Sequence, residues 1–134
     1  MSTTGPVESV STLCDGAVSG DVRRWLRLEG LIVVAAAVLV YARGGNSWLL
    51  FGILFLSPDL SFAGYLRGPR VGAAIYNIFH SYIVPIALAC GMWMAGRSIE
   101  IPLIWVAHIG FDRLLGYGLK YPTGFGHTHL GKLG

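Results

Sequence analysis

Four long apolar runs constrain the fold of this chain more than any other feature. They cover Trp25 to Tyr41, Trp48 to Leu66, Val71 to Ala95 and Ile101 to about Leu119. Each approaches the roughly 20 residues that a helix needs to cross about 30 Å of hydrocarbon. Only 13% of the residues are charged, against about 25% in ordinary soluble domains. The sequence therefore predicts an all-α membrane protein with four transmembrane helices.

The rest of the chain divides around these runs. We expect a mobile polar leader at 1–22, a four-helix transmembrane domain at 23–122 and a Gly/His-rich tail at 123–134. The first twenty residues hold two acids and no base, which is the wrong charge for a signal peptide. Cys14 and Cys90 lie in unlike surroundings, so they predict no disulfide framework and leave the redox compartment open.

The second run contains a helix-start signal in its middle. Ser57 as N-cap, Pro58 at the first helical position and Asp59 in the first turn make up this signal. The apolar stretch before it, Trp48 to Leu56, is too short to cross a bilayer alone. We therefore expect the second helix to be broken at Ser57-Pro58, where broken backbone must line a cavity or be buried in protein.

The two later runs differ in how proline interrupts them. Pro85 lies inside the third run, which is otherwise expected to form one continuous helix. Pro122 follows the fourth run, and the residue before a proline is biased away from the helical conformation. The fourth helix is therefore expected to end near Leu119.

Charge bias predicts the orientation. Cytoplasmic loops carry an excess of Lys and Arg, whereas the turns on one side of the predicted bundle hold only Arg43 and Arg97. Both termini are therefore expected to be cytoplasmic. The basic residues expected on that side are Arg23, Arg24, Arg27, Arg67, Arg70, Lys120 and Lys132.

This orientation predicts a layer of polar residues at one depth. A rise of 1.5 Å per residue places Asn77 roughly 9 Å in from the cytoplasmic helix ends, Asp59 and Asp112 roughly 11 Å, His80 roughly 13 Å and His108 roughly 18 Å. Asn77 and His80 are three residues apart, and His108 and Asp112 four, so each pair shares a helix face. A charge at this depth costs about 3 kcal/mol. We therefore expect these side chains to be paired, hydrated or bound to metal.

Two interpretations of this layer stand side by side. Asp59, His80, His108 and Asp112 offer imidazoles and carboxylates, the ligand types for Zn, Mn or Fe. Alternatively, Asp112 forms a structural ion pair with Arg113, and His80 is a hydrogen-bonded core histidine. The two histidines of the tail fit either solvent exposure or a lid over the site.

Four motifs carry a resemblance to a known family. "SPDLSFAGYL", "YNIFHSY", "HIGFDRLLGYGLKYP" and "THLG" follow one another between Trp25 and Gly131. With them, the chain resembles a small bacterial family of four-helix integral membrane proteins of unknown function. The resemblance implies a multi-pass protein of the bacterial inner membrane and brings no activity.

A weaker resemblance, in the type and order of polar residues, is to membrane-bound metal-dependent hydrolases. Those proteins carry a second Asp just after the first, where this chain has Leu60-Ser61, so a two-metal site is not implied. The resemblance implies one set of metal ligands: Asp59, His80, His108, Asp112 and His129.

These observations lead to three hypotheses. The first is a membrane-embedded metal-dependent hydrolase of a lipid or amphiphile, with Asn77, Arg113 and Lys120 in its catalytic site and Arg113 or Lys120 binding an anionic group. The second is a scaffold or accessory subunit of a larger membrane complex or homo-oligomer, favoured by many Gly and Ala suited to close helix packing. The third is a haem held by His80 and His108. Nucleic acid is not expected as a partner, because the basic residues form no stripe interleaved with aromatic residues.

Overall fold

The computed structural model describes Val18, residues 20–122 and residues 126–132. Most of the predicted leader and part of the predicted tail lie outside these residues. The described part is helical, with a short hairpin at its end. The elements are α2 (Gly20–Arg43), α3 (Trp48–Phe55), η2 (Ser57–Arg67), α4 (Pro69–Phe79), α5 (Ile83–Met94), α6 (Glu100–Leu115), β1 (His127–Thr128) and β2 (Gly131–Lys132).

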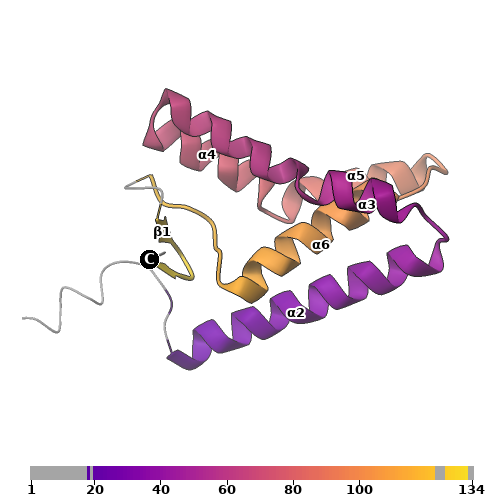
Figure 1. Cartoon of the computed structure of the whole chain (residues 1–134), viewed down its shortest axis with the longest axis horizontal. Coiled ribbons are helices and arrows are strands. Elements are labelled where there is room, and N and C mark those ends of the chain that lie inside the picture. Colours follow the sequence, from indigo (N-terminus) through magenta and orange to yellow (C-terminus); the bar gives the residue numbers. More distant parts are fainter. Residues whose placement is uncertain (1–17, 19, 123–125, 133–134) are drawn as a thin grey trace, which may run out of the picture.

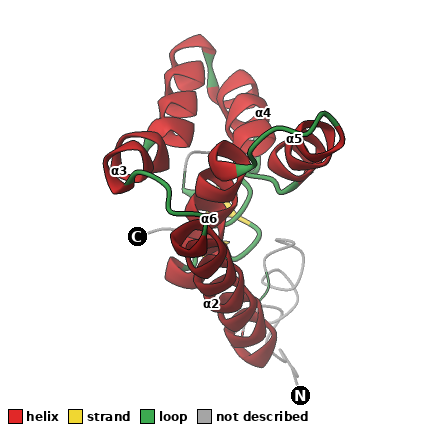
Figure 2. Ribbon diagram, turned by 90° about the vertical axis from the view of Figure 1, so that its right-hand side faces the viewer, coloured by secondary structure: helices red, strands yellow, loops and turns green. Residues whose placement is uncertain are grey.

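Helix α6 lies at the centre of the bundle. It runs beside α2 in the opposite direction (Figure 1) and also contacts α3 and α5. Seen from the side, α2 lies below α6, and α3, α4 and α5 lie around its other side (Figure 2). The helix η2 packs on α4. The central position of α6 explains why its last two turns hold the buried side of the candidate site.

Helices α2 and α6 touch backbone to backbone at two glycines. A Cβ added at Gly30 would lie 2.7 Å from the backbone nitrogen of Leu114, and one added at Gly110 would lie 2.9 Å from that of Val34. Both distances are shorter than real side chains allow. Small residues let helices in a bilayer approach closely, so this glycine seam fixes α6 against α2.

The second apolar run is broken where the sequence predicts. The α-helix α3 gives way to the 3₁₀ helix η2 at Ser57, with Pro58 at its start. Ser57, however, is not the N-cap, which corrects the prediction. Its hydroxyl donates to the carbonyl of Leu54 at 2.7 Å, and Leu56 precedes the helix without a side-chain cap. Serine bonds back to a carbonyl of the preceding turn when that helix is still in place.

The third run, predicted to be one helix over Val71 to Ala95 unbroken apart from Pro85, is broken upstream of that proline. Helix α4 ends at Phe79 and α5 begins at Ile83. Pro85 explains the break, because it has no N–H for the carbonyl of Ser81 and its ring crowds that carbonyl. The chain therefore leaves the helical path just where His80 stands.

The carbonyls freed by this break are bound by side chains of α6. The indole nitrogen of Trp105 donates to the carbonyl of Phe79 at 2.6 Å, and the guanidinium of Arg113 donates to that of His80 at 3.1 Å. Carbonyls that lose their helical partner need another one where water is scarce. These two bonds hold the broken end of α4 against the central helix.

Helix α6 ends at Gly116 rather than continuing to Leu119 ahead of Pro122, as had been predicted. Gly116 has a φ of 93°, and the amide of Tyr117 donates to the carbonyl of Asp112 at 2.8 Å. This is the glycine-based helix end known as a Schellman motif. The glycine terminates the helix before the proline can.

The hairpin β1–β2 folds back on the segment that follows α6. The amide of Tyr121 donates to the carbonyl of His127 at 2.8 Å, and the amide of His129 donates to that of Leu119 at 3.0 Å. Leu130 is fully buried beneath the turn. The described part of the tail is therefore docked on the bundle.

Three helical stretches among the described residues are long and apolar enough to cross a membrane. They are Gly20–Arg43, Trp48–Arg67 and Pro69–Met94. Helix α6 has 16 residues and is not one of them, so the expectation of four spans becomes three candidate spans around a central helix. The shorter α6 follows directly from its early end at Gly116.

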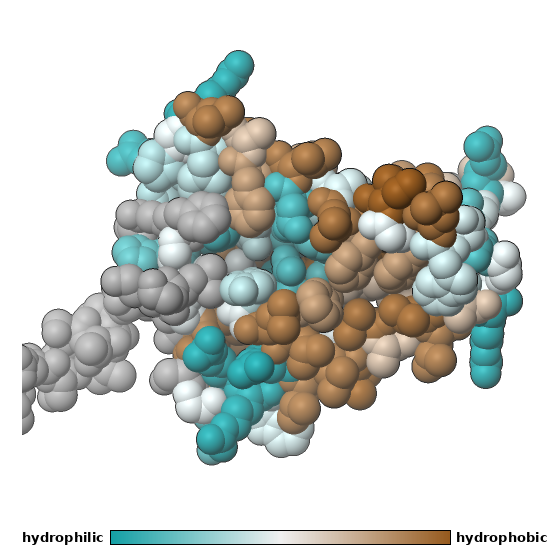
Figure 3. Space-filling view, in the orientation of Figure 1, coloured by the Kyte–Doolittle hydropathy of each residue, from teal (hydrophilic) through white to brown (hydrophobic). Residues whose placement is uncertain are grey.

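The outer surface of the bundle is apolar. Large side chains such as Leu49, Trp93 and Met94 are 76%, 74% and 86% exposed. Figure 3 shows apolar surface along the middle of α2, with polar surface toward both of its ends. Monomeric soluble proteins rarely expose such continuous apolar surface. The arrangement is that of a membrane protein.

Candidate metal centre

Four ionisable side chains meet near the centre of the bundle. Asp59 comes from the first turn of η2, His80 from the break after α4, and His108 and Asp112 from one face of α6. Each offers one ligand atom, and the four atoms lie within 4.8 Å of one another. These are the residues that the sequence places in one polar layer on three helices.

Five of the six distances between the four atoms are close to those of a tetrahedral ion site. The Nε2 atoms of His80 and His108 are 3.2 Å apart. The Oδ1 atom of Asp59 lies 3.4 Å from each of them, and the Oδ2 atom of Asp112 lies 3.5 Å from each. Four ligands at about 2.0–2.1 Å from a zinc ion would be separated by about 3.3 Å. The two histidines are thus spaced from each other and from both carboxylates as ligands of one ion would be, and the two carboxylate oxygens lie within 4.8 Å of each other.

Burial is uneven across the cluster. The side chains of His80 and His108 are 3% and 2% exposed, and that of Asp112 is 14% exposed. Asp59 is 40% exposed. The histidines therefore form the closed side of the site, and Asp59 marks its open side.

The surroundings of His80 favour metal binding through Nε2. Its Nδ1 lies 3.0 Å from the carbonyl of Tyr76, and a hydrogen placed on Nδ1 donates to that oxygen. The lone pair of Nε2 is then directed at the cluster, the arrangement usual for metal-binding histidines. The Tyr76 ring also stacks on the imidazole, with centroids 3.7 Å apart and planes 11° apart.

Tyr76 and Phe55 are residues of the site that the sequence analysis did not identify. The ring of Phe55 packs edge-on against His108, with centroids 5.3 Å apart. For Tyr76, the signal was its position four residues before His80, one helical turn away. For Phe55 there was none, because the contact joins separate helices.

Asn77 lies outside the cluster and holds the segment after α6. Its side-chain nitrogen donates to the carbonyl of Lys120 at 2.8 Å, and its side-chain oxygen accepts from the amide of Lys120 at 2.6 Å. The two bonds use both the donor and the acceptor of the Asn77 side-chain amide. Asn77 therefore positions Lys120 relative to α4.

Lys120 brings a positive charge next to the aromatic wall of the site. Its ammonium lies 4.9 Å from the ring centroid of Tyr76 and 5.4 Å from that of Phe62. The residue is only 4% exposed. Burial lowers the pKa of Lys120, and the negative charge of Asp112 opposes this effect. The lysine is thus a buried cation that faces the ring stacked on His80.

Arg113 and His129 face a cavity of about 200 Å³ that Glu29 and Tyr82 also line. The Nδ1 atom of His129 accepts from the amide of Leu119 at 2.9 Å. Burial, and then the charge of Arg113, lowers the pKa of His129. The structure brings four of the five expected ligands together and places His129 with Arg113 instead.

Comparison with known proteins gives one match. Residues 23–133 match a family described as Domain of unknown function (DUF4260). The chain belongs to the DUF4260 family. This confirms the resemblance that the four motifs carried, and the matched range contains every residue of the cluster. No curated protein and no solved structure matches the chain.

Membership in DUF4260 brings no activity with it. No hydrolase family matches the chain, so the weaker resemblance to metal-dependent hydrolases gains no support from the comparison. The function of this DUF4260 chain can therefore be inferred only from its own site.

Proposed function

We propose that this protein binds one divalent metal ion through Asp59, His80, His108 and Asp112 and uses it to hydrolyse a lipid or another amphiphile in the bilayer. The spacing of the four ligand atoms carries the proposal. Five of their six separations lie between 3.2 and 3.5 Å. The two carboxylate oxygens lie within 4.8 Å of each other, and ionisable groups at membrane depth are costly unless they are paired, hydrated or bound to metal.

The residue types agree with Zn, Mn or Fe as the ion. Such an ion supplies a water of lowered pKa and polarises the bond to be cleaved. The partly exposed Asp59 is the side from which water and substrate reach the site. Its carboxylate lies at the start of η2, where the helix dipole favours a negative charge.

Lys120 and Arg113 are the proposed binding groups for an anionic part of the substrate. Lys120 holds its charge beside Tyr76, whose ring covers His80. Arg113 is fixed by its bond to the carbonyl of His80. Arg113 thus follows the proposed ligand Asp112 in the chain, and Lys120 is separated from the proposed ligand His80 by the ring of Tyr76.

We further propose that the end of the bundle with these cations faces the cytoplasm of a bacterial inner membrane. The start of α2, the junction of η2 and α4, and the end of α6 lie at the same end (Figure 1). The basic residues that the charge bias counts lie at the first two places, in the segment after α6 and in the hairpin, and cytoplasmic loops are richer in Lys and Arg. Both termini would then be cytoplasmic.

A second candidate is a metal clasp without catalysis, in a scaffold or accessory subunit. One observation favours it: four protein ligands fill a tetrahedral shell, whereas catalytic zinc sites keep one position for water. The haem hypothesis has less support. The two Nε2 atoms are 3.2 Å apart and both carboxylates lie within 3.5 Å of them, which leaves no space for a porphyrin between the histidines.

The test uses purified protein in lipid nanodiscs, stripped with a chelator and reloaded with Zn, Mn or Fe(II). Turnover of phospholipids and long-chain acyl esters is followed by mass spectrometry. We expect metal-dependent turnover that falls by at least about 100-fold in Asp59→Asn and His108→Ala. Turnover that is unaffected by chelation would contradict the proposal. Stoichiometric metal binding without turnover would favour the clasp.

A further inference from the structure

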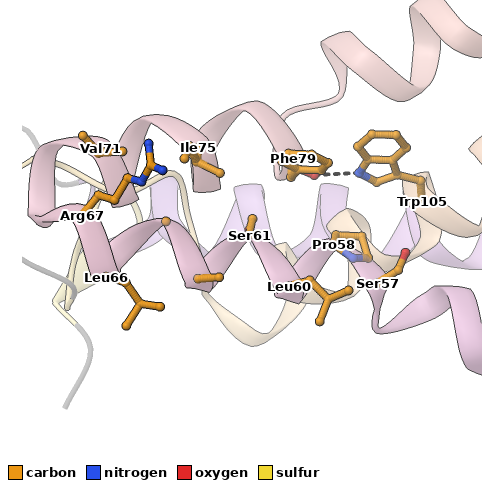
Figure 4. A pocket seen from close by; sticks show the side chains of 12 residues that line it. Ser57, Pro58, Leu60, Ser61, Leu66, Arg67, Val71, Ile75, Phe79 and Trp105 are labelled. Carbon is orange, nitrogen blue, oxygen red and sulfur yellow. Dashed lines mark hydrogen bonds between the residues drawn. The ribbon is translucent and has the colours of Figure 1, made fainter.

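A groove of about 680 Å³ runs along the outer face of the bundle between η2 and α4. Its lining includes Leu60 and Leu66 of η2, which point away from α4, and Val71 and Ile75 of α4 (Figure 4). Trp105 of α6 lies at one end. The volume is in the range of small-molecule sites, roughly 300–1,000 Å³, and such sites also have a mainly apolar lining.

One buried hydroxyl interrupts this apolar lining. Ser61 lies on the side of η2 that faces α4 and the groove (Figure 4). It is 7% exposed, and its Oγ has no hydrogen-bond partner among the described residues. A buried hydroxyl without a partner is unfavourable. A ligand with an acceptor atom at this place would remove the cost.

A cation lies along the α4 side of the groove, away from Trp105. The side chain of Arg67 extends back along α4, so that its guanidinium lies between Val71 and Ile75 (Figure 4). Guanidinium groups bind phosphate through two parallel hydrogen bonds. Along its length, the groove thus offers a cation, an apolar lining with one hydroxyl, and an aromatic ring at the Trp105 end.

We propose that this groove holds one acyl chain of an anionic phospholipid. The chain lies along the apolar lining, Ser61 donates to the ester carbonyl, and Arg67 pairs with the phosphate. Both η2 and α4 belong to helical stretches long enough to cross a membrane, so the bilayer supplies the ligand directly. This site does not depend on the proposed hydrolase activity.

The groove ends beside the metal cluster. Three of the residues that line this end adjoin a cluster residue along the chain: Pro58 precedes Asp59, Phe79 precedes His80, and Trp105 comes one turn before His108. A lipid held in the groove would therefore contact the backbone that positions three of the four ligands.

The experiment measures lipid retention on the full chain by native mass spectrometry, after the protein has been released from detergent. Phosphatidylglycerol, diacylglycerol and glycerol 3-phosphate are offered separately. We expect phosphatidylglycerol to be retained about tenfold more strongly than diacylglycerol, and glycerol 3-phosphate not to be retained. Ser61→Ala should weaken retention of both lipids about fivefold, the effect of one hydrogen bond.

Two matched pairs of variants locate the site. Arg67→Gln should remove the preference for phosphatidylglycerol, whereas Arg70→Gln, exposed and outside the groove, should keep it. Ala63→Trp should lower lipid retention at least tenfold by filling the groove, whereas Ala74→Trp, also exposed but outside it, should not. Folding of each variant is checked by its elution volume and melting temperature.

Three results would overturn the proposal. The first is full lipid retention by folded Ala63→Trp. The second is binding of glycerol 3-phosphate as tight as that of phosphatidylglycerol, which would indicate a site for free phosphate esters. The third is a change of oligomeric state in Ala63→Trp while lipid retention stays unchanged, which would indicate that the groove is a protein interface. If Ala63→Trp does not fold, Arg67→Gln decides, and a persisting lipid preference contradicts the proposal.

Discussion

Two regions hold the central helix α6 by opposite means. The glycine seam joins it to α2 with no side chain between the backbones at Gly30 and Gly110. The cluster of Asp59, His80, His108 and Asp112 joins it to η2 and α4 through four ionisable groups. Close packing of small residues stabilises helix pairs in a bilayer, whereas ionisable groups there are costly and functional. The seam therefore accounts for the fold, and the cluster needs a separate reason to exist.

The largest effect is expected at the seam. Gly30→Leu would force α2 away from α6, because even a Cβ at this position meets backbone at 2.7 Å. We expect a loss of more than about 3 kcal/mol in the free energy of unfolding, measured by denaturant titration in detergent. Gly91→Leu is the matched control, since nothing lies within 4 Å of a Cβ there. Equal stability of the two variants would show that the seam is not a close contact.

The cluster should instead respond to metal. A chelator should lower the stability of the wild type by about 3 kcal/mol if the ion is present at about 100 times its dissociation constant. His108→Ala removes a ligand, so its melting temperature should not change on chelation. The same melting shift in both proteins would mean that the chelator acts elsewhere.

A smaller effect is expected where Asn77 holds the segment between the cluster and the hairpin. Asn77→Leu loses both bonds to the backbone of Lys120, so we expect a loss of about 2 kcal/mol in stability. Asn46→Ala removes one bond, from its side-chain nitrogen to the carbonyl of Tyr41, and should cost about half as much. Because Asn77 is not a ligand, metal content should stay at one ion per chain. A loss of metal in Asn77→Leu would place this residue in the site.

The smallest effect concerns the hairpin and pH. Burial and the charge of Arg113 lower the pKa of His129 from its usual 6.5, so the unfolded chain binds the proton more readily than the folded one. Stability from this group is therefore complete above about pH 6.5 and falls as the pH drops below it. A proton on Nδ1 also abolishes the bond accepted from Leu119, worth about 1 kcal/mol.

Hydrogen exchange of the Leu119 amide measures this directly. Its protection should fall between pH 7.5 and 5 in the wild type, after correction for the intrinsic exchange rate. His129→Asn keeps an acceptor that does not titrate in this range, so its protection should not vary. A pH response of equal size in this variant would assign the effect to another group.

The sequence predicted one side of the cluster better than the other. The break that places Asp59 carries its signal at the break itself, since Pro58 starts the new helix. The break at His80 was missed because Pro85 acts on the carbonyl four residues before it and so bends the chain upstream. His108 and Asp112 were paired correctly because the helical period alone sets their common face.

Other features could not be read from the sequence because they depend on contacts between distant residues. The chain has 19 glycines, and nothing in the sequence separates Gly30 and Gly110 from the rest. The expected end of α6 near Pro122 was wrong because Gly116 offered an earlier helix end. The place of His129 depends on the pairing of the tail with the segment around Leu119, which composition does not indicate.

The proposed function requires a metal ion bound by two histidines and two aspartates on three helical elements. Elemental analysis of the purified protein, calibrated by amino-acid analysis, measures this. We predict about one Zn, Mn or Fe per chain in the wild type and less than about a tenth of that in folded His80→Ala and His108→Ala. Metal-free wild type after growth and purification with added metal, or equal metal in folded His80→Ala and His108→Ala, would contradict it.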